Sequence, residues 1–387
     1  MSTKNRPGPS QRNSDHPSVA NSNLVFTSAT AAMPSTLDIE TLEEPTATCH
    51  PTSTPTAQQA TPNGLSALRE SFTQFNVSPD VTKILMASWR VGTQKQYKTY
   101  IEKWLAFCHQ RGITYSSPKI NEALDFLMTL YNQGLSYSTI NTARSALSSI
   151  ITVDSGKHFG SHPLVLRFFK GIYELRKPQP KYNCIWDVSK VLTYLRTLHP
   201  HDAILLKSLT LKLVMLLLLV TGQRGQAIYL LSLDGMTVNT TSCQFQLLQH
   251  TKTSKPGQQC KPLVINEYTP DPKLCPLSIL KEYTQKTNPL QTGEKQLFLS
   301  FVRPHKAVSR DTISRWTKEV LKLSGIDITT FTAHSTRAAT ASKANAKDVP
   351  LDVILSTIGW ASAQTFSKFY NKLVAKENNM VDAILSS

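Results

Sequence analysis

The sequence lacks several features that would each point to a particular class of protein. Its six cysteines are scattered, and none belongs to a Cys-x-x-Cys pair or to a Cys/His cluster. Disulfide scaffolds and zinc-binding modules depend on such spacings, so neither is expected, and no metal or other cofactor is predicted. The longest apolar run, residues 213–220, is too short to span a bilayer and indicates a buried helix. No secretory signal opens the chain, which together with the unpaired thiols predicts a reducing compartment.

Acidic residues are also scarce. The chain has 26 Asp and Glu against 42 Lys and Arg, which gives a formal net charge of +16. Residues 1–70 carry a net charge of −2, so the remainder of the chain carries +18. A folded region this basic predicts an acidic partner, most commonly a nucleic acid, although a merely soluble basic surface is the alternative.

Composition and periodicity divide the chain into four segments. Residues 1–70 are dominated by Ser, Thr, Pro, Asn and Gln without apolar periodicity, and we expect them to be disordered. Residues 77–175 repeat apolar side chains at helical spacing and predict a compact helical bundle. Residues 176–185 are a proline-broken basic linker, and residues 186–387 form a second folded domain.

The second domain is predicted to be mainly helical with a small antiparallel β-hairpin. A very apolar helix over residues 203–220 is expected at its centre. Residues 244–249 alternate apolar and polar side chains, and residues 263–265 predict the returning strand. The turn residues at 255–257 place the segment 251–254 near the tip of the hairpin. The fold class is therefore mainly α.

Several residues of this domain are suited to holding or attacking a phosphate. His334 and Arg337 lie three residues apart, so they share one helical face and can point into one pocket. Trp360 and Tyr370 complete that pocket if the intervening helices fold back over it. Taken singly, each has a plainer interpretation, because a lone histidine is more often an interior residue and a lone tryptophan or tyrosine a core aromatic.

The order of these residues along the chain resembles that of the tyrosine recombinases, the phage integrase family. The matching residues are Arg224 after Thr-Gly, Lys252 within Thr-Lys-Thr, His334 and Arg337 in His-x-x-Arg, Trp360 after Gly, and the final Tyr370. The phrase at residues 134–141 resembles the family's core-binding domain, a helical SAM-like bundle. The sequence around Arg224 and Tyr370 looks closest to that of enzymes of eukaryotic mobile elements, DIRS-like retrotransposons or Cryptons. Such elements imply a nuclear protein.

The resemblance implies a site-specific recombinase that cuts and rejoins double-stranded DNA without metal, through a covalent 3′-phosphotyrosine. Tyr370 would be the nucleophile. Arg224 and Arg337 would fork onto the non-bridging phosphate oxygens. Lys252 would protonate the departing 5′ oxygen, with Lys255 as the competing candidate. His334 would act as base or hydrogen-bond donor, and the indole of Trp360 would donate to the phosphate.

Two departures from the family pattern keep other functions open. The acidic residue that usually follows the first arginine by three positions is Ala227 here, and the step from Trp360 to Tyr370 is one residue longer than in most bacterial relatives. A domesticated DNA-binding protein without activity is therefore one alternative, and a type IB topoisomerase, which shares much of this active site, is another.

We expect both domains to contact DNA, mostly at phosphates, and hence to bind in a salt-sensitive way. The candidate contacts in the helical bundle are Lys95, Lys98, Arg144 and Lys170. The tail carries an apolar stripe of Val381, Ile384 and Leu385, which is expected to dock on a neighbouring subunit of a homotetramer or to pack within its own chain.

Overall fold

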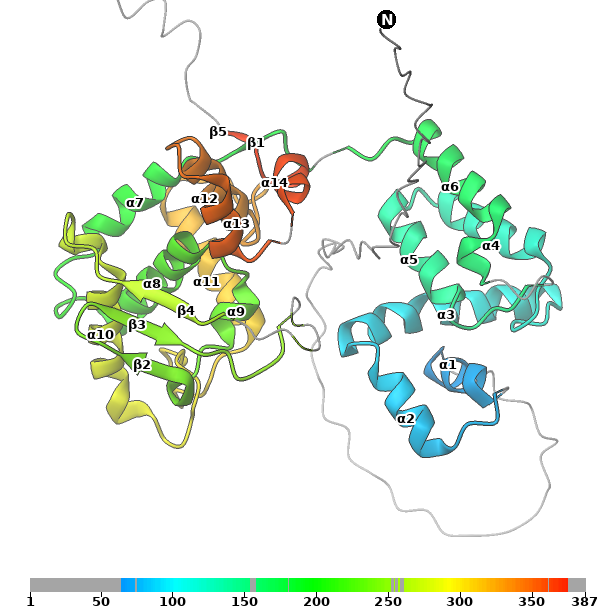
Figure 1. Cartoon of the computed structure of the whole chain (residues 1–387), viewed down its shortest axis with the longest axis horizontal. Coiled ribbons are helices and arrows are strands. Elements are labelled where there is room, and N and C mark those ends of the chain that lie inside the picture. The colour runs from blue at the N-terminus through cyan, green and yellow to red at the C-terminus, as the bar shows by residue number, and fades with distance from the viewer. Residues whose placement is uncertain are drawn as a thin grey trace, which may run out of the picture. The chain divides into compact units, whose positions relative to one another are not determined.

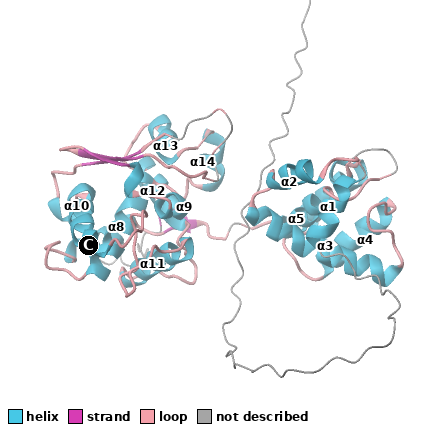
Figure 2. Cartoon of the chain, turned by 90° about the horizontal axis from the view of Figure 1, so that it is seen from below, coloured by secondary structure: helices cyan, strands magenta, loops and turns pink. Residues whose placement is uncertain are grey.

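The chain folds as two compact units, which are described separately. The computed structural model describes residues 64–73, 75–153, 158–179, 181–251, 254, 257, 261–360 and 362–374. The units are Met1–Gln179 and Pro180–Ser387 (Figure 1). Within the described residues, no helix combines the length and the apolar character needed to cross a membrane. Most of the described chain is helix or loop (Figure 2), which confirms the mainly α fold class.

The first unit is a helical bundle. Its elements are α1 (Gly64–Thr73), α2 (Pro79–Ala87), α3 (Val91–Arg111), α4 (Ile120–Asn132), α5 (Tyr137–Leu147), the 3-10 helix η1 (Phe159–Ser161) and α6 (Pro163–Leu175). The Ser78 hydroxyl caps α2 by accepting from the Val81 amide, and Ser136 caps α5 by accepting from Thr139. Capping hydroxyls of this kind satisfy amides that a helix leaves unpaired at its start.

The core of this bundle surrounds Trp104 of α3. The indole is fully buried, donates to the Tyr115 carbonyl at 3.0 Å and packs edge-on against Phe126 of α4, 5.3 Å between ring centroids. Helix α5 packs along α3 with Ile140 and Leu147 fully buried. The apolar periodicity of the sequence therefore places one continuous core inside the bundle.

Helix α1 corrects one expectation. Residues 64–70 were expected to be disordered with the rest of the N-terminal segment, but they are helical. Ala67 and Leu68 are fully buried, and Gly64 lies so close to α3 that a β-carbon on it would be 2.7 Å from the Lys98 carbonyl oxygen. Burial against α3 stabilises a segment too short to show its own periodicity. Residues 1–63 of that prediction lie outside the described residues.

The second unit has a central helix wrapped by shorter ones. Its helices are α7 (Val188–Thr197), α8 (Leu206–Thr221), α9 (Gly225–Tyr229), η2 (Leu233–Gly235), η3 (Pro272–Leu274), α10 (Pro276–Thr287), η4 (Asn288–Leu290), α11 (Arg310–Leu323), α12 (Ser335–Asn345), α13 (Leu351–Ile358) and α14 (Ala363–Phe369). Helix α8 is buried without interruption from Leu209 to Leu219, as its apolar sequence predicted. It packs against α10, α11 and α12 (Figure 1).

Two small sheets accompany these helices. The strands β2 (Met236–Val238), β3 (Ser242–Phe245) and β4 (Leu263–Asn266) pair antiparallel in that order, with Phe245 opposite Leu263. The sequence predicted an antiparallel hairpin, and its second strand, residues 263–265, agrees with β4. The first strand was predicted at residues 244–249, whereas β3 ends at Phe245. Strand β2 was not predicted, since three residues are too few to show alternation. The strands β1 (Cys184–Ile185) and β5 (Leu373–Val374) pair parallel, which ties the two ends of this unit together (Figure 1).

Candidate active site

The end of helix α8 brings together segments that are far apart in sequence. Gly222 ends the helix in the left-handed conformation, with φ +58°, and a β-carbon on it would be 2.6 Å from the Ile358 side chain at the end of α13. Only glycine meets both conditions without strain. Gln223 then donates to the Thr357 carbonyl at 3.0 Å. The Thr-Gly break therefore fixes Arg224 beside the end of α13.

Arg337 is the buried centre of this arrangement. It lies on α12, is 1% exposed, and its two terminal nitrogens donate to the carbonyl oxygens of Gly222 at 3.1 Å and Ile358 at 3.2 Å. Its Nε is buried and has no hydrogen-bond partner among the described residues. Burial, followed by the nearby charge of Arg224, lowers the pKa of Arg337 to about 10, while Tyr370 acts in the opposite direction. The guanidinium remains a cation at neutral pH, and its buried positive charge would be stabilised by a nearby anion.

Trp360 and Tyr370 cover one side of that guanidinium. The Trp360 ring lies 5.0 Å from Arg337 Cζ, and its centroid is 4.3 Å from that of Tyr370 with 34° between the ring planes. Trp360 is 9% exposed, and its indole Nε1, like Arg337 Nε, is buried with no partner in the part of the chain that the structure describes. Buried donors normally find acceptors, and neither of these two has one among the described residues, so both can donate to an acceptor from outside the chain.

Arg224 and Ala227 lie at the other edge of the site. Arg224 is half-buried at the start of α9, and its charge acts on Arg337. Ala227, one helical turn later, is 4% exposed. The position that usually holds a carboxylate is therefore buried and apolar in this chain, and no acidic side chain on α9 braces Arg224.

His334 lies immediately before α12 and is exposed, three residues from the buried Arg337. The neighbouring Ser335 is fully buried, accepts from the Trp186 indole at 2.8 Å and donates to the Thr332 carbonyl at 2.6 Å. These two hydrogen bonds of Ser335 fix the start of α12, and the His334 imidazole lies on the solvent side of the helix. The structure thus gathers Arg224, Arg337, Trp360 and Tyr370, with His334 at the rim.

Lys252 and its competitor Lys255 lie outside the described residues, so the structure does not place either one. The described neighbours form a small turn in which the Thr251 amide donates to the Ser254 hydroxyl at 2.9 Å. The apolar stripe of Val381, Ile384 and Leu385 also lies outside the described residues.

The four basic candidates of the first unit differ in their surroundings. Lys95 on α3 and Lys170 on α6 are exposed. Lys98 on α3 pairs with Glu102 at 3.7 Å. Arg144 on α5 is half-buried and stacks its guanidinium 4.8 Å from the Phe169 ring centroid, and burial lowers its pKa. Lys95 and Lys170 are thus the most accessible to a partner, while Arg144 also packs against the core.

Sequence reasoning missed the residues that hold the chain around Tyr370. Ser342 of α12 donates to the Tyr370 carbonyl at 2.7 Å, and Lys372 donates to the Tyr182 carbonyl at 2.8 Å. A serine inside a helix and a lysine before a two-residue strand carry no local signal, since both act on backbone groups. Only the tertiary fold brings them to this place.

Groups of three or more His, Cys, Asp or Glu residues that could hold a metal ion do not occur in the described part of the chain. The cysteines that the structure describes are free thiols: Cys108, Cys184, Cys243 and Cys275.

Comparisons with known proteins place this site in a family. The family model described as "Phage integrase family" matches residues 192–377. A search of curated proteins found no match. Similar solved structures include the XerH site-specific recombinase bound to difH substrate in a pre-cleavage complex, at 14% identity and a TM-score of 0.51, with 85% of this chain and 90% of that chain covered. The XerH post-cleavage complex is 13% identical with the same coverage and a TM-score of 0.51.

A lambda integrase dimer bound to a COC′ core site is 18% identical over 78% of this chain and 77% of that one, with a TM-score of 0.48. The fold likeness rests on the XerH structures, and the family assignment rests on the matched domain. The resemblance seen in the sequence is thereby confirmed for the second unit: residues 192–377, which contain Arg224, His334, Arg337, Trp360 and Tyr370, match the model of the phage integrase family.

Proposed function

We propose that this protein is a site-specific DNA recombinase that cuts and rejoins double-stranded DNA through a covalent 3′-phosphotyrosine at Tyr370. The observation that carries the proposal is the pair of buried donors, Arg337 Nε and Trp360 Nε1, which lack a partner among the described residues and belong to side chains that pack against the Tyr370 ring. A phosphodiester offers anionic acceptor oxygens, which is what such donors lack. The XerH structures, whose fold this chain shares, are recombinases bound to their DNA substrate, which supports the same partner here.

In the proposed reaction the Tyr370 hydroxyl oxygen forms a bond to phosphorus while the bond from phosphorus to the 5′ oxygen breaks. The Tyr370 proton passes to a base, for which His334 is the candidate, and Lys252 gives a proton to the 5′ oxygen. The free 5′ hydroxyl that results can attack the phosphotyrosine, which reverses the step and rejoins the strand. The phosphotyrosine conserves the bond energy, and therefore no cofactor is needed.

The side chains of the site divide this work. Arg224 and Arg337 neutralise the charge that builds up on the non-bridging oxygens, where a preorganised donor typically contributes a factor of about 100 in rate. Each terminal nitrogen of Arg337 donates one N–H to a backbone carbonyl, and Nε, which has no partner among the described residues, is the donor proposed for the phosphate. Lys252 is the proposed acid for the 5′ oxygen, and His334 at the rim is the proposed base or donor.

The proposed DNA contacts are mainly to phosphates and rely on the net charge of +16. Exposed Lys95 and Lys170 are the first candidates, and Lys98 and Arg144 are the second.

We further propose that a homotetramer assembles on DNA through the apolar stripe of Val381, Ile384 and Leu385, and that the protein works in the nucleus on a mobile element. Replacing the three stripe residues by Ser would leave monomers on DNA, as measured by mass photometry.

Covalent capture tests the proposed reaction. The purified protein is incubated with nicked DNA drawn from element-flanking sequence or a random library, denatured, and examined for DNA bound to protein. We expect an adduct that is lost in Tyr370→Phe and kept in Tyr194→Phe, a control on α7. No adduct despite salt-sensitive DNA binding would favour an inactive DNA-binding protein, with the missing carboxylate at Ala227 as the first cause. Plasmid relaxation by monomers without recombinant products would instead favour a topoisomerase.

A further inference from the structure

One hydroxyl holds both sides of the turn that follows Tyr370. Ser342 on α12 is 3% exposed, and its Oγ donates to the Tyr370 carbonyl oxygen at 2.7 Å while accepting from the Lys372 amide at 3.1 Å. A serine hydroxyl has one donor and two acceptor sites, so a single side chain satisfies both contacts. Because the group is buried, solvent cannot replace it when it is removed.

Residues 372–374, which follow this turn, are also held by contacts with the start of this unit. Lys372 Nζ donates to the Tyr182 carbonyl at 2.8 Å and lies 5.0 Å from the centroid of the Tyr182 ring. The next residue begins β5, which pairs with β1, with Leu373 opposite Cys184 (Figure 1). Burial and the nearby Tyr370 raise the pKa of Tyr182, which agrees with this segment lying beside Tyr370. The backbone of Tyr370 is therefore held from α12 on one side and followed by an anchored strand.

Helix α12 carries both Arg337 and Ser342. The five-residue step corresponds to a rise of roughly 7.5 Å along a rigid helix. Arg337 contacts the ring of Tyr370 from one turn, 6.0 Å from Cζ to the ring centroid, and Ser342 holds the Tyr370 backbone from another. A single element thus sets the distance between the guanidinium and the tyrosine that the proposed function assigns as nucleophile.

We propose that Ser342 is a positioning residue for Tyr370: it fixes the backbone on both sides of the turn and so holds the phenol against the Arg337–Trp360 site. The proposal rests on the proposed function, since positioning has meaning only if Tyr370 attacks the phosphate. A nucleophile displaced by about 1 Å can lose a factor of about 100 in rate. Ser342 touches neither the phosphate nor the phenol oxygen, so its effect is confined to placement.

The test compares Ser342→Ala with Thr317→Val in the full chain. Thr317 of α11 is 1% exposed and donates only to its own helix, to the Ile313 carbonyl at 2.8 Å, so this control also removes a buried hydroxyl. Three quantities are measured: hydrogen–deuterium exchange of residues 370–374, DNA affinity, and the rate of covalent adduct formation at saturating DNA. A loss of general stability affects both variants alike, whereas a loss of positioning affects one.

We expect Ser342→Ala to exchange the Lys372 amide faster, to bind DNA as the wild type does, and to form the adduct about 100-fold more slowly at saturating DNA. Thr317→Val should differ from the wild type only in thermal stability. Unchanged exchange in Ser342→Ala, or an adduct rate equal to that of the wild type, would overturn the positioning role while the proposed function stands. A wild type that forms no adduct would overturn the proposed function itself, and the two failures are thus told apart.

Discussion

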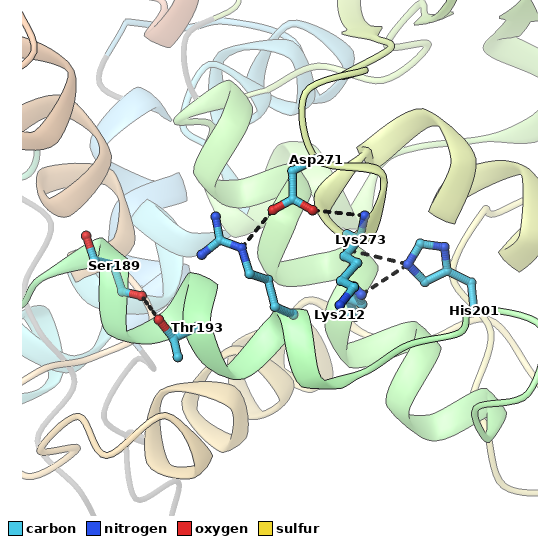
Figure 3. Close-up of polar contacts among 7 residues, drawn as sticks. Ser189, Thr193, His201, Lys212, Asp271 and Lys273 are labelled. Carbon is cyan, nitrogen blue, oxygen red and sulfur yellow. Dashed lines mark hydrogen bonds and ion pairs between the residues drawn. The ribbon is translucent and has the colours of Figure 1, made fainter.

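Two buried cations in the second unit, Lys212 and Arg337, lie in opposite kinds of surroundings. Lys212 of α8 is fully buried, donates to the Leu198 carbonyl at 2.6 Å and lies 3.1 Å from His201 Nε2. Figure 3 shows the Lys212 and His201 side chains pointing toward one another, with Asp271 and Lys273 nearby. Arg337 is almost as buried but keeps an Nε without a partner among the described residues, next to an indole nitrogen in the same condition.

The difference separates a cation whose donors are paired within the fold from one that keeps an unpaired Nε among the described residues. Lys212 uses its donors on the loop between α7 and α8, and Lys286 of α10 binds the same loop by donating to the Asp202 carbonyl at 2.7 Å. Arg337 uses part of its donors on the fold and leaves the rest beside Tyr370. Burial alone does not distinguish the two, since both cost desolvation, whereas the pairing of their N–H groups does.

Arg337→Lys should give the largest effect, because it removes the planar donor set while keeping the charge. We expect adduct formation to fall by about 100- to 1000-fold, since an ammonium cannot reach two carbonyls and a phosphate together. The measurement is the single-turnover rate of adduct formation at saturating DNA. Arg196→Lys, at an ion pair with Asp271 of 2.7 Å, is the matched control and should react at the wild-type rate. Equal rates in Arg337→Lys and the wild type would remove Arg337 from the phosphate site.

Trp360→Phe should give the next largest effect, because it deletes the unpartnered indole N–H and keeps an aromatic ring beside Tyr370. One hydrogen bond to a charged group corresponds to roughly a 10- to 100-fold change in rate. The same adduct assay measures it. In Trp104→Phe the deleted N–H donates to the Tyr115 carbonyl, so that control should lower the melting temperature and leave the rate per bound protein unchanged. A lower melting temperature without a slower reaction in Trp360→Phe would make Trp360 a core residue only.

The order of chemical groups along the sequence predicted this site better than any single residue did. Arg224, Arg337, Trp360 and Tyr370 are gathered as expected, because a glycine break, a helix and the aromatic residues that follow it are each visible locally. Helix α8 was likewise predicted, from a continuous apolar run. Local chemistry determines these features, and the sequence displays it directly.

The residues that act on backbone groups across the fold could not be predicted. The contacts of Ser342 join residues 28 and 30 positions apart, and those of Lys372 and the β1–β5 pair join segments about 190 residues apart. Neither strand is long enough to show a period. The contacts of Lys212 with Leu198 and His201, in the loop before α8, likewise have no local signal in the sequence. The helical state of residues 64–70 was missed for the same reason, since it depends on packing against α3.

Lys212→Met should change the pH dependence of stability and leave the reaction unchanged, because Lys212 pairs within the fold. Burial lowers the pKa of Lys212 from its ordinary 10.5 to about 8; the charge of Asp271 opposes this and that of Lys273 adds to it. Between about pH 8 and 10.5 the unfolded state binds a proton that the folded state has lost, so the free energy of unfolding rises with pH in this window. The rise should disappear in Lys212→Met, with a difference of a few °C in melting temperature. Thermal unfolding at both ends of the window measures it, and the adduct rate should stay at the wild-type value.

His201→Gln should give the smallest effect, a change in the free energy of unfolding at acidic pH. Burial first, and then the charge of Lys212, lower the pKa of His201 below its ordinary 6.5, against the raising influence of the Lys273 carbonyl and Glu282. As the pH falls from ~7.5 to ~5.5 the unfolded state takes up the proton first, so the wild type should lose stability that His201→Gln does not lose. Urea unfolding at the two pH values measures the difference. In Lys212→Met the acid-side loss should shrink without vanishing, because burial of the imidazole remains when its charged neighbour is gone. If Lys212→Met lost as much stability at low pH as the wild type, the Lys212 and His201 side chains would not interact. Lys212 would then lack one of the two partners that distinguish it from Arg337.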